Sequence, residues 1–416
     1  MNLKVRLSIM SFMQFAVWGA YLTCMGIYLS RIGMGHHIGS FFAMQGFVSF
    51  FMPTVIGIIA DRWIPAQRLY GCCHLVAGVS MVLAGLYGQQ AGMHVSFPVL
   101  FSLYSLSIAF YMPSLSLSYS VAYNALTMEG QDIVKSFPPI RVFGTVGFIA
   151  MMWFVDVMDY EQNHNQFIVS GVLGILLFLY SFTLPSCPVN RRQGNRSYAE
   201  RFGLQAFVLF KRRDMAVFLV FSVFIGICLQ ITNGFATPYI NHFQSVPAYA
   251  DSFGVKYPVI LYSISQFSET FCILLIPFFM KRFGIKKVVV IAAVAWFLRF
   301  GLLGMGNPGS GAWMFVLSMV IYGVAFDFFN ISGSLFINQT TDTKMRSSAQ
   351  GMFLLMTNGV GATIGSLAAQ AVVNAHTAAD GSVQWVECWY VFAVYALIVG
   401  VAFHFLFHPE KKEALL

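Results

Sequence analysis

Residues 321–334 read IYGVAFDFFNISGS and place a carboxylate, Asp327, in the middle of a run that is otherwise apolar enough to lie in a membrane. An acid at mid-bilayer costs roughly 2.5–3.5 kcal/mol on insertion scales, so such residues normally face a bundle interior or a watery cavity. Asn330 follows on the same helical face, and Tyr322 and Phe326 form an aromatic pair beside it. The pattern favours a role in substrate binding or ion coupling. The alternative is a structural, hydrogen-bonded acid between helices.

The composition of the whole chain agrees with a membrane setting. Hydrophobic residues make up 58% of the 416 positions and charged residues only 10%, which excludes a soluble globular domain of this size. Apolar runs of about 20 residues are long enough to cross a bilayer as helices. We therefore expect an all-α membrane protein with twelve transmembrane helices, near residues 7–30, 38–60, 69–88, 95–118, 138–158, 165–184, 215–240, 257–280, 288–306, 311–336, 347–374 and 386–408.

The basic residues predict the orientation of these helices. With the N-terminus inside, the outer loops hold only Arg31 and Lys256, and Arg141 and Arg299 lie within predicted helices. All other Lys and Arg residues fall on the inner side, which predicts cytoplasmic N- and C-termini. The net charge of +8 follows from this topology. It does not indicate nucleic-acid binding, because the basic residues alternate with spans and form no single patch.

The predicted helices divide into two groups of six, residues 1–184 and 215–416, joined by a polar, basic stretch at residues 185–214. Basic turns at comparable places in the two groups, GIIADRWIPAQR (57–68) and MKRFGIKK (280–287), suggest an internal repeat. We interpret the stretch at 185–214 as a cytoplasmic linker between two six-helix bundles.

The turn at residues 57–68 resembles the loop signature of the major facilitator superfamily, with Gly57, Asp61, Arg62 and Arg68 in the matching positions. The second glycine of that signature is absent. The resemblance implies that Asp61 and Arg62 act in conformational gating on the cytoplasmic side. An ordinary helix-ending turn with a solvated acid is the alternative.

Polar side chains recur in pairs one helical turn apart inside other predicted helices. These pairs are Arg141 with Thr145, Gln230 with Asn233, and Gln266 with Glu269. Amides and carboxylates can bind ribose hydroxyls and base edges, and aromatic rings stack on planar faces. The set suits a neutral polar solute. It contains no nucleophile and base pair of an enzyme, no metal-ligand spacing and no cofactor motif.

Two other polar residues within predicted helices are interpreted as lying outside the site. Arg299 is expected near the outer end of the 288–306 run, with its side chain reaching the interface or pairing locally. His74 is expected to be a packed, hydrogen-bonded core residue, with a proton relay as the alternative.

Several motifs in one order carry a more specific likeness. FPPIRVFGTVGF, LQITN, SISQFSET, AWFLRFGLLGMGNP, YGVAFDFFNISGS and SAQGMFLLMTNGVG together resemble the bacterial nucleoside permeases of the nucleoside:proton symporter family, within the major facilitator superfamily. The resemblance implies proton-coupled import of purine and pyrimidine nucleosides, such as uridine and adenosine, across the bacterial inner membrane by a protein that functions as a monomer in the lipid bilayer.

The resemblance also implies a set of site residues. A central nucleoside site would contain Arg141, Thr145, Gln230, Asn233, Gln266, Glu269, Tyr322, Phe326 and Asp327. Asp327 and Glu269 would take part in proton coupling: Asp327 would accept a proton from outside, and its neutral form would let the loaded carrier reorient. Two alternatives stay open: a carrier of a sugar or other small polar metabolite, and a non-transporting membrane sensor.

Overall fold

A computed structural model describes residues 2–187, 204–342 and 345–409. Inside the helices it leaves a few side chains undescribed, among them those of Asp61 and Arg62. The predicted gating pair and most of the predicted linker at 185–214 therefore lie outside the described residues.

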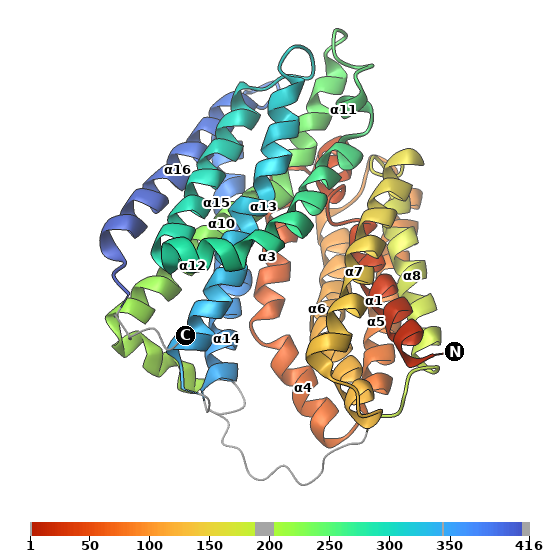
Figure 1. Ribbon diagram of the computed structural model, residues 1–416. Helices are drawn as coiled ribbons and strands as arrows, with labels where there is room; N and C mark the ends of the chain where they lie inside the picture. The colour runs from red at the N-terminus through yellow and green to blue at the C-terminus, as the bar shows by residue number, and fades with distance from the viewer. Residues whose placement is uncertain (1, 188–203, 343–344, 410–416) are drawn as a thin grey trace. The chain divides into compact units, whose positions relative to one another are not determined.

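The described chain is helical, apart from one isolated antiparallel bridge between Thr377 and Val383 (Figure 1). The first part contains α1 (Leu3–Gly19), α2 (Met25–Arg31), η1 (Gly35–His37), α3 (Ile38–Ser49), α4 (Met52–Arg62), α5 (Ala66–Ala91), α6 (Phe97–Met128), α7 (Ile133–Val157) and α8 (Asn165–Ser181).

The second part begins after the undescribed stretch. It contains η2 (Leu204–Lys211), α10 (Arg213–His242), η3 (Phe243–Ser245), α11 (Phe253–Lys256), α12 (Pro258–Met305), α13 (Ala312–Thr340), α14 (Arg346–Leu354), the π-helical η4 (Leu355–Gly361), α15 (Ala362–Ala375) and α16 (Trp385–Leu406).

Eight helices in the described ranges are long and apolar enough to cross a bilayer. They are α5, α6, α7, α10, α12, α13, the continuous stretch from α14 through α15, and α16. The predicted runs at 7–30 and 38–60 are each divided into two shorter helices, α1 with α2 and α3 with α4. Conversely, α12 contains two predicted runs, because its helical backbone continues on both sides of a kink at Gly284, where φ is +69°. Glycine tolerates this left-handed conformation.

The chain forms two compact units. Unit 1 contains the described residues 2–187 together with the outer part of α10, Asn233–Asn241, and the start of α12, Tyr257–Ile260. Within it the carboxylate of Asp156 accepts a hydrogen bond of 2.7 Å from the N–H of Ile260. An acid at a helix start satisfies backbone donors that have no partner within the helix.

Close contact between α1 and α7 positions the polar side chains of unit 1. A Cβ atom at Gly147 of α7 would overlap the backbone of Phe12 in α1. Small residues at such crossings let two membrane helices approach closely. The crossing brings the α7 side chains that follow Pro139 next to the rings of α1.

Unit 2 contains the remaining described residues. Its α12 and α13 are held close at Gly323, where a Cβ atom would overlap the backbone of Ser268. The hydroxyl of Ser268 also donates a hydrogen bond to the carbonyl of Val320. This crossing fixes the relative positions of the polar residues on the two helices.

Candidate functional site

Asp327 lies in the middle of α13 and is only 2% exposed. Its Oδ2 atom is buried without a hydrogen-bond partner among the described residues. Glu269, on the first segment of α12, is close enough to interact with it electrostatically. A buried carboxylate without hydrogen bonds loses its hydration without compensation, and a bound proton removes that charge. Asp327 therefore has the surroundings of a proton-accepting group.

An aromatic group lies beside this acid. Tyr322 and Phe326 stack with ring centroids 5.6 Å apart and an interplanar angle of 15°. The ring of Trp296 meets Tyr322 edge to face at 5.9 Å. Stacked and edge-to-face rings of this kind add stabilisation beyond their buried area. The predicted aromatic pair is thus a fixed surface built from two helices.

A small cavity in unit 2 adjoins the aromatic group. Polar and apolar side chains from α10, α12, α13 and η4 line it: Ile225, Gly226, Leu229, Trp296, Phe326, Phe329, Asn330, Thr357 and Asn358. The π-helical turn of η4 supplies Thr357 and Asn358, and π-helical turns occur frequently at functional sites. The cavity has hydrogen-bonding groups next to ring faces, which is the composition of a site for a small polar molecule.

Arg299 differs from the sequence interpretation. Its side chain is fully buried, at 0% exposed, so it does not reach the interface. Its Nη1 donates to the carbonyl of Ser318 at 2.6 Å, and its Nε and Nη2 donate to the hydroxyl of Thr232 at 3.1 and 2.9 Å. Its guanidinium lies 4.8 Å from the ring centre of Tyr322. Of the two expected outcomes, reaching the interface is wrong and local pairing is confirmed, because neighbouring helices supply acceptors and ring faces inside the bundle.

The sequence contained a signal for this position. Arg299 has apolar neighbours for about two helical turns on both sides within the predicted run at 288–306, which is too deep for a side chain to reach the interface easily. Its partner Thr232, and Trp296 beside Tyr322, carried no such signal, since a threonine and a tryptophan are common in membrane helices.

Arg141 is half-buried on α7 in unit 1. Its Nε donates to the hydroxyl of Tyr119 at 3.2 Å, and its guanidinium lies 3.9 Å from the ring centre of Phe15. Its two terminal nitrogens donate no hydrogen bond to any acceptor among the described residues. Thr145 is half-buried one turn further along α7. Arg141 therefore keeps a donor pair available for a ligand.

The remaining predicted residues, Gln230, Asn233, Gln266 and Glu269, are half-buried. Gln230 lies on the part of α10 in unit 2, and Asn233 on the part in unit 1. Gln266 and Glu269 are one turn apart on α12, and Glu269 also interacts electrostatically with Tyr322. Unit 2 thus brings Glu269, Tyr322, Phe326 and Asp327 together.

Unit 1 also contains a buried network of neutral polar groups. Gln14 donates to the hydroxyl of Ser114 at 3.0 Å, and its Oε1 lies 2.8 Å from Nε2 of His74. The hydroxyl of Tyr111 donates to the carbonyl of Gln14 at 2.8 Å. His74 is fully buried, as expected for a packed core residue.

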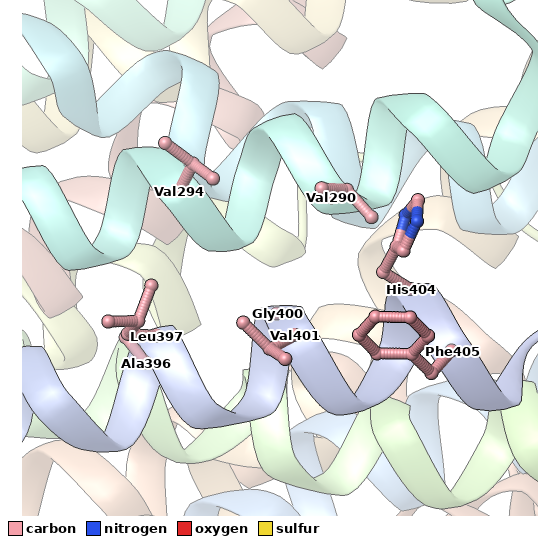
Figure 2. Close-up of a pocket in the computed structure, with 8 residues that line it drawn as sticks. All are labelled: Val290, Val294, Ala396, Leu397, Gly400, Val401, His404 and Phe405. Atoms are coloured by element: carbon pink, nitrogen blue, oxygen red, sulfur yellow. The ribbon is translucent and has the colours of Figure 1, made fainter.

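A second hollow in unit 2 differs in character. It lies between the second segment of α12 and α16 and is lined by Val290, Val294, Ala396, Leu397, Gly400, Val401, His404 and Phe405 (Figure 2). All of these except His404 are apolar. His404 is the one hydrogen-bonding side chain in this lining, whereas a site for a polar solute has several convergent polar groups.

Comparison with known proteins places the chain in a family. A model described as "Nucleoside H+ symporter" matches residues 1–412. The xanthosine permease of Escherichia coli K12 is 44% identical over 99% of this chain and 98% of its own length. The nucleoside permease NupG of the same strain is 42% identical over 98% of this chain and 96% of its own length.

Solved structures agree with this result. A crystal structure of a mutant of the nucleoside transporter NupG matches 98% of this chain and all of its own chain, with a TM-score of 0.93 and 41% identity. The D-xylose-proton symporter shares the fold alone, with a TM-score of 0.70 and 12% identity. The chain therefore belongs to the nucleoside H+ symporter family, a family of membrane transporters and not of enzymes.

Proposed function

We propose that this protein imports nucleosides together with protons by alternating access. The observation that carries the proposal is the carboxyl group of Asp327, which is buried next to Glu269 with one oxygen unpartnered among the described residues. In a nucleoside H+ symporter, a membrane acid of this kind is suited to carry the coupled proton.

The substrate would bind through polar side chains of α7, α10 and α12 and through rings of α13. Arg141 and Thr145 from α7, Gln230 and Asn233 from α10, and Gln266 and Glu269 from α12 would bind the ribose hydroxyls and base edges. Tyr322 and Phe326, already stacked at 5.6 Å, would offer a ring face to the base. Because relatives include a xanthosine permease and NupG, we include xanthosine with uridine and adenosine as candidate substrates.

The proton would bind to Asp327 from the outside. Its neutral form would let the loaded carrier reorient, and release of the proton inside would reset the site. Glu269 would share the coupling and bind substrate hydroxyls. One charge crossing 100 mV contributes about 2.3 kcal/mol, which at about 1.4 kcal/mol per tenfold supports roughly forty-fold accumulation.

The proposed topology is that of twelve membrane crossings in two bundles. The two crossings within α12 would be separated by the kink at Gly284, and α1 with α2 and α3 with α4 would each form one crossing. Residues 1–184 and 215–416 would form the bundles, joined by a cytoplasmic linker at 185–214. The protein would act as a monomer in the bacterial inner membrane with both termini inside, and Asp61 and Arg62 would gate the cytoplasmic side.

Uptake into proteoliposomes tests the proposal. Labelled uridine, adenosine and xanthosine are supplied with and without an imposed inward proton gradient, and a protonophore serves as the control. Gradient-driven accumulation of at least one nucleoside is expected. Uptake that is competed by a free sugar and by no nucleoside would identify a sugar carrier. Nucleoside binding without any flux would identify a sensor.

A further inference from the structure

Arg299 connects three helical segments of unit 2 from inside the bundle. It lies on the second segment of α12 and donates hydrogen bonds to Thr232 on α10 and to the Ser318 carbonyl on α13. Its Nη1 also lies 3.5 Å from the hydroxyl of Ser265 on the first segment of α12. The guanidinium also lies 4.8 Å from the ring centre of Tyr322 and 5.8 Å from that of Tyr262, and its Nη2 lies 3.6 Å from the sulfur of Met319.

These contacts lie next to residues assigned to the substrate. Thr232 follows Gln230 by two positions on α10, and Ser265 directly precedes Gln266 on α12. Tyr322 is itself one of the assigned residues. Arg299 therefore contacts the three segments at points adjacent to the proposed binding side chains, although it is 0% exposed. A group this deeply buried acts on a ligand through its neighbours.

The chemistry of these contacts requires arginine. A guanidinium is a planar fork with five N–H donors, whereas a lysine ammonium is a compact point charge on a flexible stem. Here all three guanidinium nitrogens donate hydrogen bonds to oxygen atoms, and the guanidinium group lies near the ring of Tyr322. The described surroundings of Arg299 supply hydroxyls, a carbonyl and ring faces, and no ion pair. Such a group fixes the geometry of its neighbours because every donor is engaged.

We propose that Arg299 is a positioning residue for substrate recognition. It holds the ring of Tyr322 and the segments carrying Gln230 and Gln266 in the orientation that binds the nucleoside. The inference rests on the proposed function and adds a residue that does not touch the substrate. It predicts that the effects of substituting Arg299 and Tyr322 on uridine affinity are strongly non-additive.

The test is a double-mutant cycle on the full-length purified protein. Uridine binding is measured by titration calorimetry for the wild type, Arg299→Lys, Tyr322→Leu and the double variant, and thermal unfolding is followed for each. We expect Arg299→Lys to weaken uridine binding about tenfold, the scale of one or two lost hydrogen bonds, because an ammonium cannot reproduce the forked contacts of the guanidinium. In the Tyr322→Leu background the same change should weaken binding less than twofold, because contacting residues that act together are not additive.

Each result has a definite meaning. If the loss of uridine affinity in the double variant equals the product of the losses in the two single variants, the proposal is overturned. A lowered unfolding temperature with unchanged uridine affinity would also overturn it, because Arg299 would then be purely structural. If Arg299→Lys does not fold, Thr232→Val replaces it in the cycle, with an expected loss of about tenfold from the two hydrogen bonds that the Thr232 hydroxyl accepts. A wild-type protein that binds no nucleoside would overturn the proposed function together with this inference. If the wild type binds uridine and both Arg299→Lys and Thr232→Val bind it with unchanged affinity, only this inference is overturned.

Discussion

Arg141 and Arg299 differ in how many of their guanidinium nitrogens donate hydrogen bonds to other described residues. Both residues lie in apolar helices, and both lie near an aromatic face, Phe15 for the first and Tyr322 for the second. Arg299 is fully buried and donates from all three nitrogens. Arg141 is half-buried and donates only from Nε within the described residues. The described residues therefore supply acceptors to every guanidinium nitrogen of Arg299 and to only one nitrogen of Arg141, which is the difference that the two proposed roles rest on.

Replacing Arg141 gives the largest expected effect. Arg141→Gln should weaken uridine binding by about a hundredfold, because hydrogen bonds from a charged group contribute about 1.5–3 kcal/mol. The unfolding temperature should change little, since only one hydrogen bond to Tyr119 is lost. Calorimetry and thermal unfolding of the same preparations check this, with Arg141→Lys as the charge-preserving control. If Arg141→Gln lost much of its thermal stability and bound uridine with unchanged affinity, Arg141 would have the structural role and would not be a ligand-binding residue.

Removing the ring under Arg141 should have a smaller effect. The guanidinium lies 3.9 Å from the ring centre of Phe15, and a cation–π contact contributes about 0.5–2 kcal/mol. Phe15→Leu should raise the Kd for uridine about threefold by loosening Arg141. Phe47→Leu, at a ring that is 50% exposed, is the matched control. Equal effects of both substitutions would show that Arg141 does not depend on the ring.

The smallest expected effect concerns Glu161, a buried acid between α7 and α8 that is 0% exposed. Burial raises its pKa, and both of its carboxylate oxygens are buried without a hydrogen-bond partner among the described residues. A folded-state pKa above the unfolded value means that the ionised form is disfavoured in the folded protein. Stability should therefore fall as pH rises through the folded pKa and recover as pH falls towards the ordinary glutamate range.

Glu161→Gln should remove this dependence. The variant should unfold at a slightly higher temperature than the wild type at pH 8, and the difference should shrink at pH 5. Thermal unfolding of both proteins across this pH range checks the sign. If the difference in unfolding temperature between variant and wild type grew as pH fell, the ionised carboxylate of Glu161 would be stabilised in the folded protein. That result would contradict the raised pKa that its burial causes.

Much of the fold follows from hydropathy, because apolar length decides which segments can cross a bilayer. The predicted runs at 69–88 and 165–184 agree closely with α5 (Ala66–Ala91) and α8 (Asn165–Ser181). The break between α1 and α2 was missed, since residues 20–24 are as apolar as the helices around them. Hydropathy predicts which residues are buried, but it does not predict where the helical backbone is interrupted.

The site was predictable only in part. Asp327 was detectable because a carboxylate within an apolar run is costly, and the structure places it beside Glu269 and the Tyr322 ring. The role of Arg299 was not detectable, since it depends on which helices meet at its guanidinium. Thr232 and Ser318 are far from it in sequence, and the sequence alone gives no evidence of their contact.

The most direct test of the account is proton movement coupled to substrate. Uridine is added outside lightly buffered proteoliposomes that contain wild-type protein or Asp327→Asn, and external pH is recorded beside exchange of labelled uridine. The account predicts external alkalinisation with the wild type, none with Asp327→Asn, and uridine exchange in both. Alkalinisation of equal size in Asp327→Asn would contradict it, because the coupled proton would then be carried by another group.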